Sequence, residues 1–320
     1  MKTLRFLLVL ACVACPSALR AQDFYLFAGH DHDKQSHSSY AWQLAYQQKL
    51  FSFIDWGFSW INEGHYPTSH RDGPALQLLA RRDFLGERLS LMAGYGPYRY
   101  FDTESSKHAR SFKDAHGWGQ VLTAAAAWNF SSGWLVQARL NHIVTDKSLE
   151  TTSLQFGLGY RLSRGDGKGS GPDYRDLKNE VTAYYGKTIV NSTTSQSARA
   201  YGFEYRRELR SWLDWTAGYL HEGNPDIVRR GGVTTQFWPK REFFGGRAAL
   251  GAGFGAYAAV DERKHSGEGA GGGVFITGLM TMTASYRFSP HIALRANWNR
   301  TITSYNRDTD VMTVGAGYRF

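Results

Sequence analysis

The chain closes with the stretch Val311-Met312-Thr313-Val314-Gly315-Ala316-Gly317-Tyr318-Arg319-Phe320. From position 312 onward, the even-numbered residues are apolar and the odd-numbered residues are small or polar. Successive side chains of a β-strand point to opposite faces, so this period of two predicts a strand with one apolar and one polar face. The same alternation recurs at 52–63 and 117–130, which makes it a pattern of the whole chain.

Eight strands of this kind are expected in the first half of the chain. We place them at about 23–30, 39–50, 52–63, 74–83, 87–100, 117–130, 133–144 and 151–162. The connections between them alternate in length, with short turns after 83 and 130 and longer polar segments at 64–73, 101–116 and 145–150. Short turns on one side and long loops on the other are typical of a transmembrane β-barrel.

The composition favours the same fold. Mean hydropathy is −0.42 and no segment after the first 21 residues has the run of apolar residues that a membrane helix needs. Aromatic residues nevertheless make up 15% of the chain. Low hydropathy with many aromatics is expected when only every second residue of a strand faces lipid. A soluble β-sandwich also alternates, but aromatics near the short turns, such as Trp56, Trp128 and Tyr160, favour a membrane interface.

The two halves of the chain are similar to each other. Residues 40–102 align with 199–261 without a gap, so that Asp55-Trp56 corresponds to Asp214-Trp215. The segment 163–178 between them begins with Gly, Ser and charged residues, and we interpret it as a flexible periplasmic linker or turn. We therefore expect a tandem duplication, with one eight-stranded repeat at 22–162 and another at 179–320. Sixteen strands in one barrel is the favoured arrangement, and two eight-stranded barrels is the alternative.

The N-terminal segment predicts export. Lys2 and Arg5 precede an apolar stretch, and small residues lie before Gln22, so 1–21 are expected to be a cleaved signal peptide. The only cysteines, Cys12 and Cys15, lie in this segment, which leaves no disulfide for the mature chain. The formal net charge is +9, but the basic residues are scattered without a nucleic-acid-binding motif. A positive balance suits contact with the phosphates of outer-membrane lipids and lipopolysaccharide.

Tyr318 and Phe320 end an amphipathic last strand, which resembles the C-terminal signal of bacterial outer-membrane barrels. The resemblance implies a location in the bacterial outer membrane and recognition by the barrel-assembly machinery through these two residues.

A second resemblance lies in the last four strands of each half, from about Leu85 to Leu162 and from about Phe244 to Phe320. In the first half a glycine-rich strand is followed by one that ends Arg139-Leu140-Asn141-His142, by a short polar segment and by a final strand. This order resembles the lipid A 3-O-deacylase family, eight-stranded esterases of the outer membrane. It implies ester hydrolysis, with His142 as the family's histidine and Glu150 as its glutamate.

The family's serine nucleophile has no counterpart in this chain. Its position, two residues after His142, holds Val144, and the matching positions of the second half are Arg300 and Ile302. A Ser-His-acid site needs a hydroxyl within hydrogen-bond reach of the imidazole. Thr145 is adjacent, but in a strand it points to the opposite face. We therefore favour a barrel without enzymatic activity and keep the esterase as the alternative.

Polar side chains on the inward faces point to the favoured function. The charged residues expected to face the lumen are Glu63, Arg81, Arg139, Glu204, Arg206, Glu222, Lys240 and Arg295. In a wide barrel they would line a channel or binding site for a polar solute such as a polysaccharide, and in narrow barrels they would form an ion network. A third hypothesis is that the barrel has a structural or adhesive role. His65, His70 and Asp72 have metal-ligand chemistry, but a polar loop explains them as well, and we expect neither metal nor cofactor.

Overall fold

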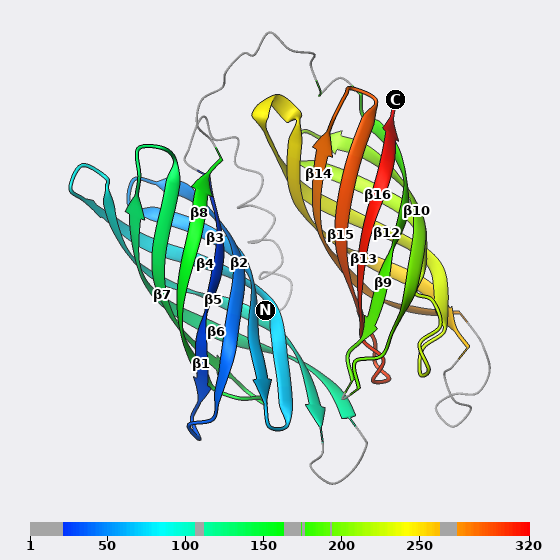
Figure 1. Cartoon of the computed structure of the whole chain (residues 1–320), viewed down its shortest axis with the longest axis horizontal. Helices are drawn as coiled ribbons and strands as arrows, with labels where there is room; N and C mark the ends of the chain where they lie inside the picture. Colours follow the sequence, from blue (N-terminus) through cyan, green and yellow to red (C-terminus); the bar gives the residue numbers. More distant parts are fainter. Residues whose placement is uncertain (1–21, 106–111, 163–173, 175–176, 193, 263–273) are drawn as a thin grey trace, which may run out of the picture. The chain divides into compact units, whose positions relative to one another are not determined.

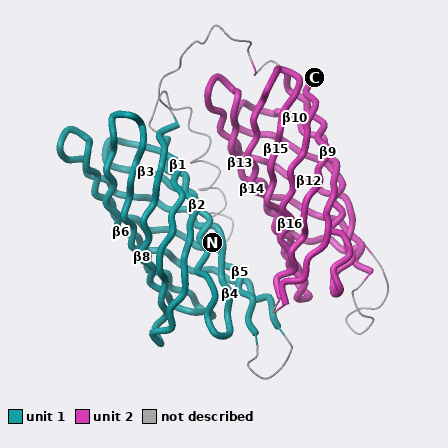
Figure 2. The backbone as a smooth tube through the Cα atoms, viewed as in Figure 1, with its two compact units in different colours: residues 1–165 teal, residues 166–320 magenta. Residues whose placement is uncertain are grey.

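The computed structural model describes residues 22–105, 112–162, 174, 177–192, 194–262 and 274–320. The expected signal peptide and most of the expected linker lie outside the described residues. The described part divides into two compact units, residues 1–165 and 166–320 (Figure 2), and each is described by itself.

Unit 1 is a closed antiparallel barrel in which every strand pairs with its neighbours in sequence, and the last strand pairs with the first (Figure 1). Its strands are β1 (Gln22–Asp33), β2 (Ser38–Phe51), β3 (Ile54–Tyr66), β4 (Ser69–Phe84), β5 (Leu89–Ser105), β6 (Phe112–Asn129), β7 (Trp134–Thr145) and β8 (Thr151–Arg161).

Unit 2 is a second closed barrel of the same topology. Its strands are β9 (Asn179–Val190), β10 (Ser197–Arg210), β11 (Leu213–His221), β12 (Arg230–Phe243), β13 (Ala248–Asp261), β14 (Phe275–Arg287), β15 (Ile292–Ile302) and β16 (Thr309–Arg319), with a 3-10 turn, η1, at Phe244–Gly246. The sixteen expected strands are present, but they do not form one barrel. One sixteen-stranded ring is therefore wrong, and the alternative of two eight-stranded barrels is confirmed.

Glycines on the last strand of each unit leave room for inward side chains of the first strand where each barrel closes. In unit 1 a Cβ at Gly157 would lie 2.3 Å from a ring carbon of Phe27, and a Cβ at Gly159 would lie 2.4 Å from one of Tyr25. These pairs face each other across the β1–β8 ladder. In unit 2 a Cβ at Gly315 would similarly lie 2.5 Å from both Tyr184 and a backbone oxygen. Inward aromatic rings of the first strand therefore face last-strand residues without a side chain in both barrels.

Several strands of unit 1 extend further than the alternation predicts. The expected polar loops at 64–73 and 101–116 are for the most part strand, since β3 runs to Tyr66, β4 begins at Ser69 and β5 runs to Ser105. The hydrogen-bonded ladder continues past the apolar belt into polar sequence, with a register shift between Asn62 and His65. We call this end of unit 1, with the β1–β2, β3–β4, β5–β6 and β7–β8 connections, its loop end, and the opposite end its turn end.

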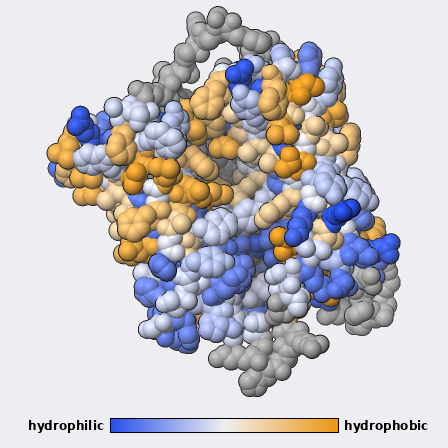
Figure 3. All heavy atoms as spheres, viewed as in Figure 1, coloured by the Kyte–Doolittle hydropathy of each residue, from blue (hydrophilic) through white to orange (hydrophobic). Residues whose placement is uncertain are grey.

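The exterior of each barrel is apolar. Alternate residues such as Leu140, Leu154, Phe156 and Leu158 are exposed, while their strand neighbours are buried. On the visible face of each unit, hydrophobic residues gather toward the end reached by β8 or β16, and hydrophilic residues gather toward the other end (Figure 3). None of the described helices is long and apolar enough to cross a bilayer. An antiparallel barrel with an apolar outer belt satisfies all its backbone hydrogen bonds while facing lipid, so this is the exterior of a membrane-spanning barrel.

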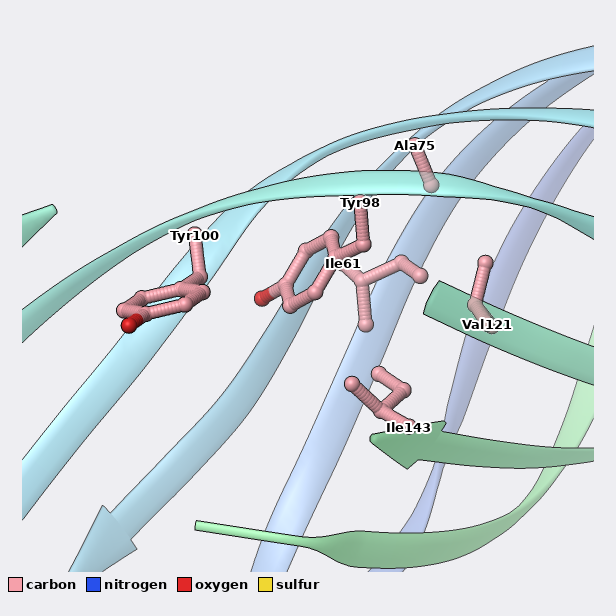
Figure 4. Packing of buried hydrophobic residues seen from close by; sticks show 6 residues of the cluster. All are labelled: Ile61, Ala75, Tyr98, Tyr100, Val121 and Ile143. Atoms are coloured by element: carbon pink, nitrogen blue, oxygen red, sulfur yellow. The ribbon is translucent and has the colours of Figure 1, made fainter. Parts of the chain in front are cut away.

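Side chains fill the interior. One cluster of unit 1 consists of buried residues from five strands (Figure 4): Ile61, Ala75, Tyr98, Tyr100, Val121 and Ile143. Beneath it, toward the turn end, polar side chains continue across the barrel: Gln77 donates to Thr123 Oγ1 at 2.9 Å and Thr123 donates to Asn141 Oδ1 at 2.7 Å. An eight-stranded barrel has room for little more than its own side chains.

Candidate functional site

Glu63 on β3 and Arg71 on β4 form the interior network nearest the loop end of unit 1. Arg71 Nε donates to Glu63 Oε1 at 2.8 Å, and Nη2 donates to Oε2. Tyr98 also donates to Oε1 at 2.8 Å, and Thr151 donates to Oε2 at 2.5 Å. Both charged side chains are buried and both are fully hydrogen-bonded, as a stable buried ion pair requires.

Two further interior arginines of unit 1 differ in their partners. Arg81 donates to Asp55 at 3.1 Å and to Asp83 at 2.7 Å. Arg139 is 2% exposed; its Nε donates to Gln137 Oε1 at 3.0 Å, and its guanidinium carbon lies 4.7 Å from the ring centre of Phe27. Among the described residues no carboxylate forms an ion pair with Arg139.

Unit 2 repeats the loop-end network of unit 1. Arg230 donates to Glu222 at 2.6 Å and 2.7 Å, and Thr309 donates to Glu222 at 2.6 Å. Arg230 also contacts Tyr305 OH at 3.1 Å. Burial raises the pKa of Tyr305 above its ordinary value, so the hydroxyl stays protonated and donates to Asp261 at 3.0 Å.

The end of unit 2 where β9 begins, opposite the Glu222–Arg230 network, holds three more of the charges expected to face inward, Arg206, Lys240 and Arg295. Glu180 accepts from Arg206 at 2.5 Å and from Arg295 at 2.9 Å. Lys240 Nζ lies 2.5 Å from Glu208 and 3.1 Å from Asp214.

Glu204 lies deeper in unit 2 and accepts a hydrogen bond of 3.2 Å from Tyr184 OH. With it, all eight charges expected to face inward lie inside the barrels and contact other interior side chains. Such networks fill a narrow barrel with charged and polar side chains in contact with one another, and they leave a wide aqueous path nowhere in the parts just described.

A different group lies on the outer wall of unit 1, near its loop end. His142 is on β7, Thr152 is on β8, and the two residues pair directly across the ladder. His142 Nδ1 lies 3.0 Å from Thr152 Oγ1, and Nε2 lies 3.4 Å from Glu150 Oε1. The next outward residues toward the turn end, Leu140 and Leu154, are exposed and apolar. A hydroxyl, an imidazole and a carboxylate therefore follow one another at the edge of the lipid-facing belt.

The neighbouring strand adds two basic residues to this group. His32 on β1 pairs with Thr152 from the side opposite His142. Lys34 follows β1 directly, and its Nζ lies 2.5 Å from Glu150 Oε2. His32 and Lys34 are exposed, while His142 and Thr152 are half-buried. We call the five residues His32, Lys34, His142, Glu150 and Thr152 the outer-wall site.

The equivalent place in unit 2 has other chemistry. Arg300 and Asp310 hold the positions that correspond to His142 and Thr152, and they pair across β15 and β16. Arg300 Nε donates to Asp310 Oδ1 at 2.6 Å and Nη2 donates to Oδ2 at 2.9 Å. Asp308, at the position of Glu150, accepts a hydrogen bond of 2.7 Å from the backbone N–H of Thr303. This place therefore holds a bidentate ion pair, with neither a hydroxyl nor an imidazole at the two positions.

The sequence predicted only part of the outer-wall site. It placed His142 beside Glu150, and the structure brings the two together, whereas Val144 is exposed on the same wall and carries no reactive group. Thr152 was missed, because its contact depends on the register between two strands. His65 and His70 stack at 4.2 Å between ring centres. The part of the chain that the structure describes holds no cluster of three metal-ligating residues.

Comparisons with known proteins describe the fold alone. No protein-family model matches the chain, and no curated protein matches it. The N-terminal β-barrel domain of Pseudomonas aeruginosa OprF matches at 12% identity, covering 44% of this chain and 96% of that one, with a TM-score of 0.36. Neisserial surface protein A matches at 6% identity over 45% and 97%, with a TM-score of 0.36. An outer membrane channel from Pseudomonas putida F1 matches at 13% identity over 96% of each chain, with a TM-score of 0.23.

Proposed function

We propose that the protein is a bacterial outer-membrane barrel protein whose first unit hydrolyses acyl esters of membrane lipids at the outer-wall site. The observation that carries the proposal is the chain of contacts from Thr152 Oγ1 through His142 to Glu150, at 3.0 Å and 3.4 Å, on the wall that faces lipid. A hydroxyl at hydrogen-bond distance from an imidazole, with a carboxylate close to the other ring nitrogen, is the arrangement that activates a hydroxyl for acyl transfer.

The chemistry follows from the two faces of the imidazole. With Nε2–H directed at Glu150, the lone pair of Nδ1 is free to accept the Thr152 proton. The alkoxide oxygen then attacks the ester carbonyl, the carbonyl electrons move to oxygen, and the intermediate collapses as the alcohol leaves with the proton from Nδ1. Water, deprotonated in turn by His142, cleaves the acyl-threonine, releases the fatty acid and restores the hydroxyl. Glu150 stabilises the imidazolium in both steps.

The position of the site suits a lipid ester. Leu140 and Leu154 lie below it along the wall, where acyl chains run, and the polar loop end lies above it. Lys34 brings a cation that suits the phosphates of an anionic headgroup. An ester at the join between headgroup and acyl chain would sit at the height of Thr152. The resemblance of this half to lipid A deacylases supports the same class of substrate.

The other function that the sequence raised, passage or binding of a polar solute such as a saccharide, needs an open lumen. The paired interior charges, such as Glu63–Arg71 and Glu222–Arg230, occupy that space in both barrels. They therefore support the surface reaction over transport.

The test is lipid hydrolysis by refolded protein. Vesicles of phospholipid, and separately of phospholipid with lipopolysaccharide, are incubated with protein, and mass spectrometry measures released fatty acid and residual lipid. We expect the wild type to release fatty acid and His142→Gln to release it at least about a hundredfold more slowly. The control is His30→Gln, which alters an exposed histidine on the same face of β1 as His32 and should leave the rate of release unchanged. Lipids left intact by the wild type in both vesicle types would refute the proposal.

A further inference from the structure

The loop that carries Glu150 is fastened from inside the barrel, directly behind the outer-wall site. We propose that Arg71, held by Glu63, is a positioning residue for Glu150, so that the interior ion pair sets the carboxylate against His142. The inference deepens the proposed function and rests on it for its catalytic meaning.

Arg71 holds the residues on both sides of Glu150. Its Nη1 donates to Ser148 Oγ at 2.9 Å and to the carbonyl oxygen of Leu149, and its Nη2 donates to Thr151 Oγ1 at 3.1 Å. One guanidinium therefore fixes three of the four residues from 148 to 151. The fourth, Glu150, points the other way, toward His142 and Lys34 on the outer wall.

Glu63 and its neighbours keep Arg71 in place. Both side chains of the pair are buried, with exposures of 0% and 1%. Ser148 gains a second anchor, because its hydroxyl donates to Asp102 at 2.5 Å, and Asp102 also accepts from Ser69 at 2.5 Å. A guanidinium fork that is hydrogen-bonded on every side, away from water, has one geometry.

The contact that this geometry controls is sensitive to position. Glu150 Oε1 lies 3.4 Å from His142 Nε2, so a small outward movement of the loop separates the two groups. Misplacement of a catalytic group by about 1 Å costs on the order of a hundredfold in rate. A loop held by three hydrogen bonds from one buried residue is protected against that movement.

Unit 2 supplies a matched control. Arg230 makes the same contacts there, with Glu222, with Thr309 Oγ1 at 2.7 Å and with the carbonyl oxygen of Arg307 at 3.2 Å. The loop it holds carries Asp308 at the position of Glu150, but it lies beside the Arg300–Asp310 pair, which has no imidazole for a carboxylate to orient. Arg71→Lys and Arg230→Lys therefore disturb equivalent networks, of which only one lies behind the outer-wall site.

The experiment measures both variants in full-length refolded protein with histidine labelled for NMR. We expect the two substitutions to lower the unfolding temperature alike. Only Arg71→Lys should shift the His142 Nε2 resonance, in the direction that Glu150→Gln shifts it, and lower kcat about tenfold with KM within about twofold. In a Glu150→Gln background, Arg71→Lys should have no further effect on kcat. A purely structural role would lower activity again.

The outcomes separate the two proposals. An unmoved His142 resonance in Arg71→Lys overturns the positioning role, whether or not the protein hydrolyses lipid. A moved resonance in a protein without hydrolysis upholds the contact and refutes the proposed function. If Arg71→Lys does not refold, Thr151→Val and Ser148→Ala remove two of the three loop contacts without touching the guanidinium, and they are expected to shift the same resonance.

Discussion

Thr152 Oγ1 lies 3.0 Å from His142 Nδ1, although the two residues belong to different strands and are ten positions apart. Directly paired residues of an antiparallel ladder have Cβ atoms about 4.5–5.5 Å apart on the same face. Residues two apart on one strand also share a face but lie about 6.6–6.8 Å apart along it. A cross-strand hydroxyl is therefore closer to the imidazole than one at the Val144 position of the same strand would be.

The Thr152 hydroxyl is expected to be the nucleophile. Thr152→Val should abolish fatty-acid release, by about a thousandfold or more, because it keeps the shape and removes the reacting oxygen. Thr152→Ser should retain activity. Because the site acts as a unit, Thr152→Val combined with His142→Gln should lose no more than either alone. Full activity in Thr152→Val would mean that another group attacks the ester.

The second barrel offers an inactive version of the same wall. His142→Arg with Thr152→Asp places the pair of Arg300 and Asp310 in unit 1. We expect this variant to refold with an unfolding temperature close to that of the wild type, because the ion pair is already accommodated by one barrel, and to release no fatty acid. Circular dichroism in detergent checks the fold, and mass spectrometry of the lipids checks activity. Retained hydrolysis would move the reaction away from the outer wall.

Arg139 is expected to lower the free energy of unfolding. It is a buried cation with a neutral partner, Gln137, and an aromatic ring, Phe27. Arg139→Met replaces it with an apolar side chain of similar length and should raise the free energy of unfolding by about 1–4 kcal/mol. Arg71→Met should instead lower it by about 3–5 kcal/mol, because Glu63 would be left buried without its cation. Urea unfolding in lipid vesicles measures both, and equal signs would contradict this account of the interior.

Neither barrel is expected to conduct ions. Interior charges such as Glu222 and Arg230 form ion pairs inside the barrel, and a planar bilayer containing refolded protein should show no stepwise conductance. The control is a bilayer with a wide porin measured under the same conditions. Regular conductance steps that a substitution at Glu222 alters would restore the channel as the working function.

The last strand is expected to guide assembly. Tyr318 and Phe320 are half-exposed, at 52% and 50%, on the outer face of unit 2, where a partner can reach them. Phe320→Ala should slow insertion in cells, which the ratio of folded to unfolded protein on unboiled gels measures. Leu162→Ala, at the end of the first unit, should have the weaker effect. An unchanged ratio in Phe320→Ala would exclude this role.

The period-two pattern predicted the strands because it reflects burial on one face alone. It placed β7 at 133–144, and the structure has Trp134–Thr145. Closure of a barrel depends on pairing between two strands that are far apart in the sequence. The same alternation permits β8 to pair with β1 or with β9. Gly157 and Gly159 face Phe27 and Tyr25 at the closure of unit 1, but β16 carries glycines at the equivalent positions, so the sequence permits either pairing.

The candidate site was likewise predictable from the sequence only in part. His142 and Glu150 are separated by a short connection, so their meeting was predictable from the sequence. Thr152 needed the β7–β8 register, and Arg71 needed the path of a side chain across the barrel to residue 148. Contacts that cross the interior of a barrel produce no periodic pattern in the sequence.

An even number of strands returns the polypeptide to the side of the membrane from which it set out. The barrel of unit 1 begins at Gln22 and ends at Arg161, which lie at the same end of the barrel, with Asp23 and Arg161 in direct register. A second barrel can therefore be concatenated without any connecting segment having to traverse the bilayer. Each copy can acquire its own surface chemistry while its neighbour keeps an inert wall, so a membrane barrel of this size can be multiplied in the way that soluble domains are strung along a chain.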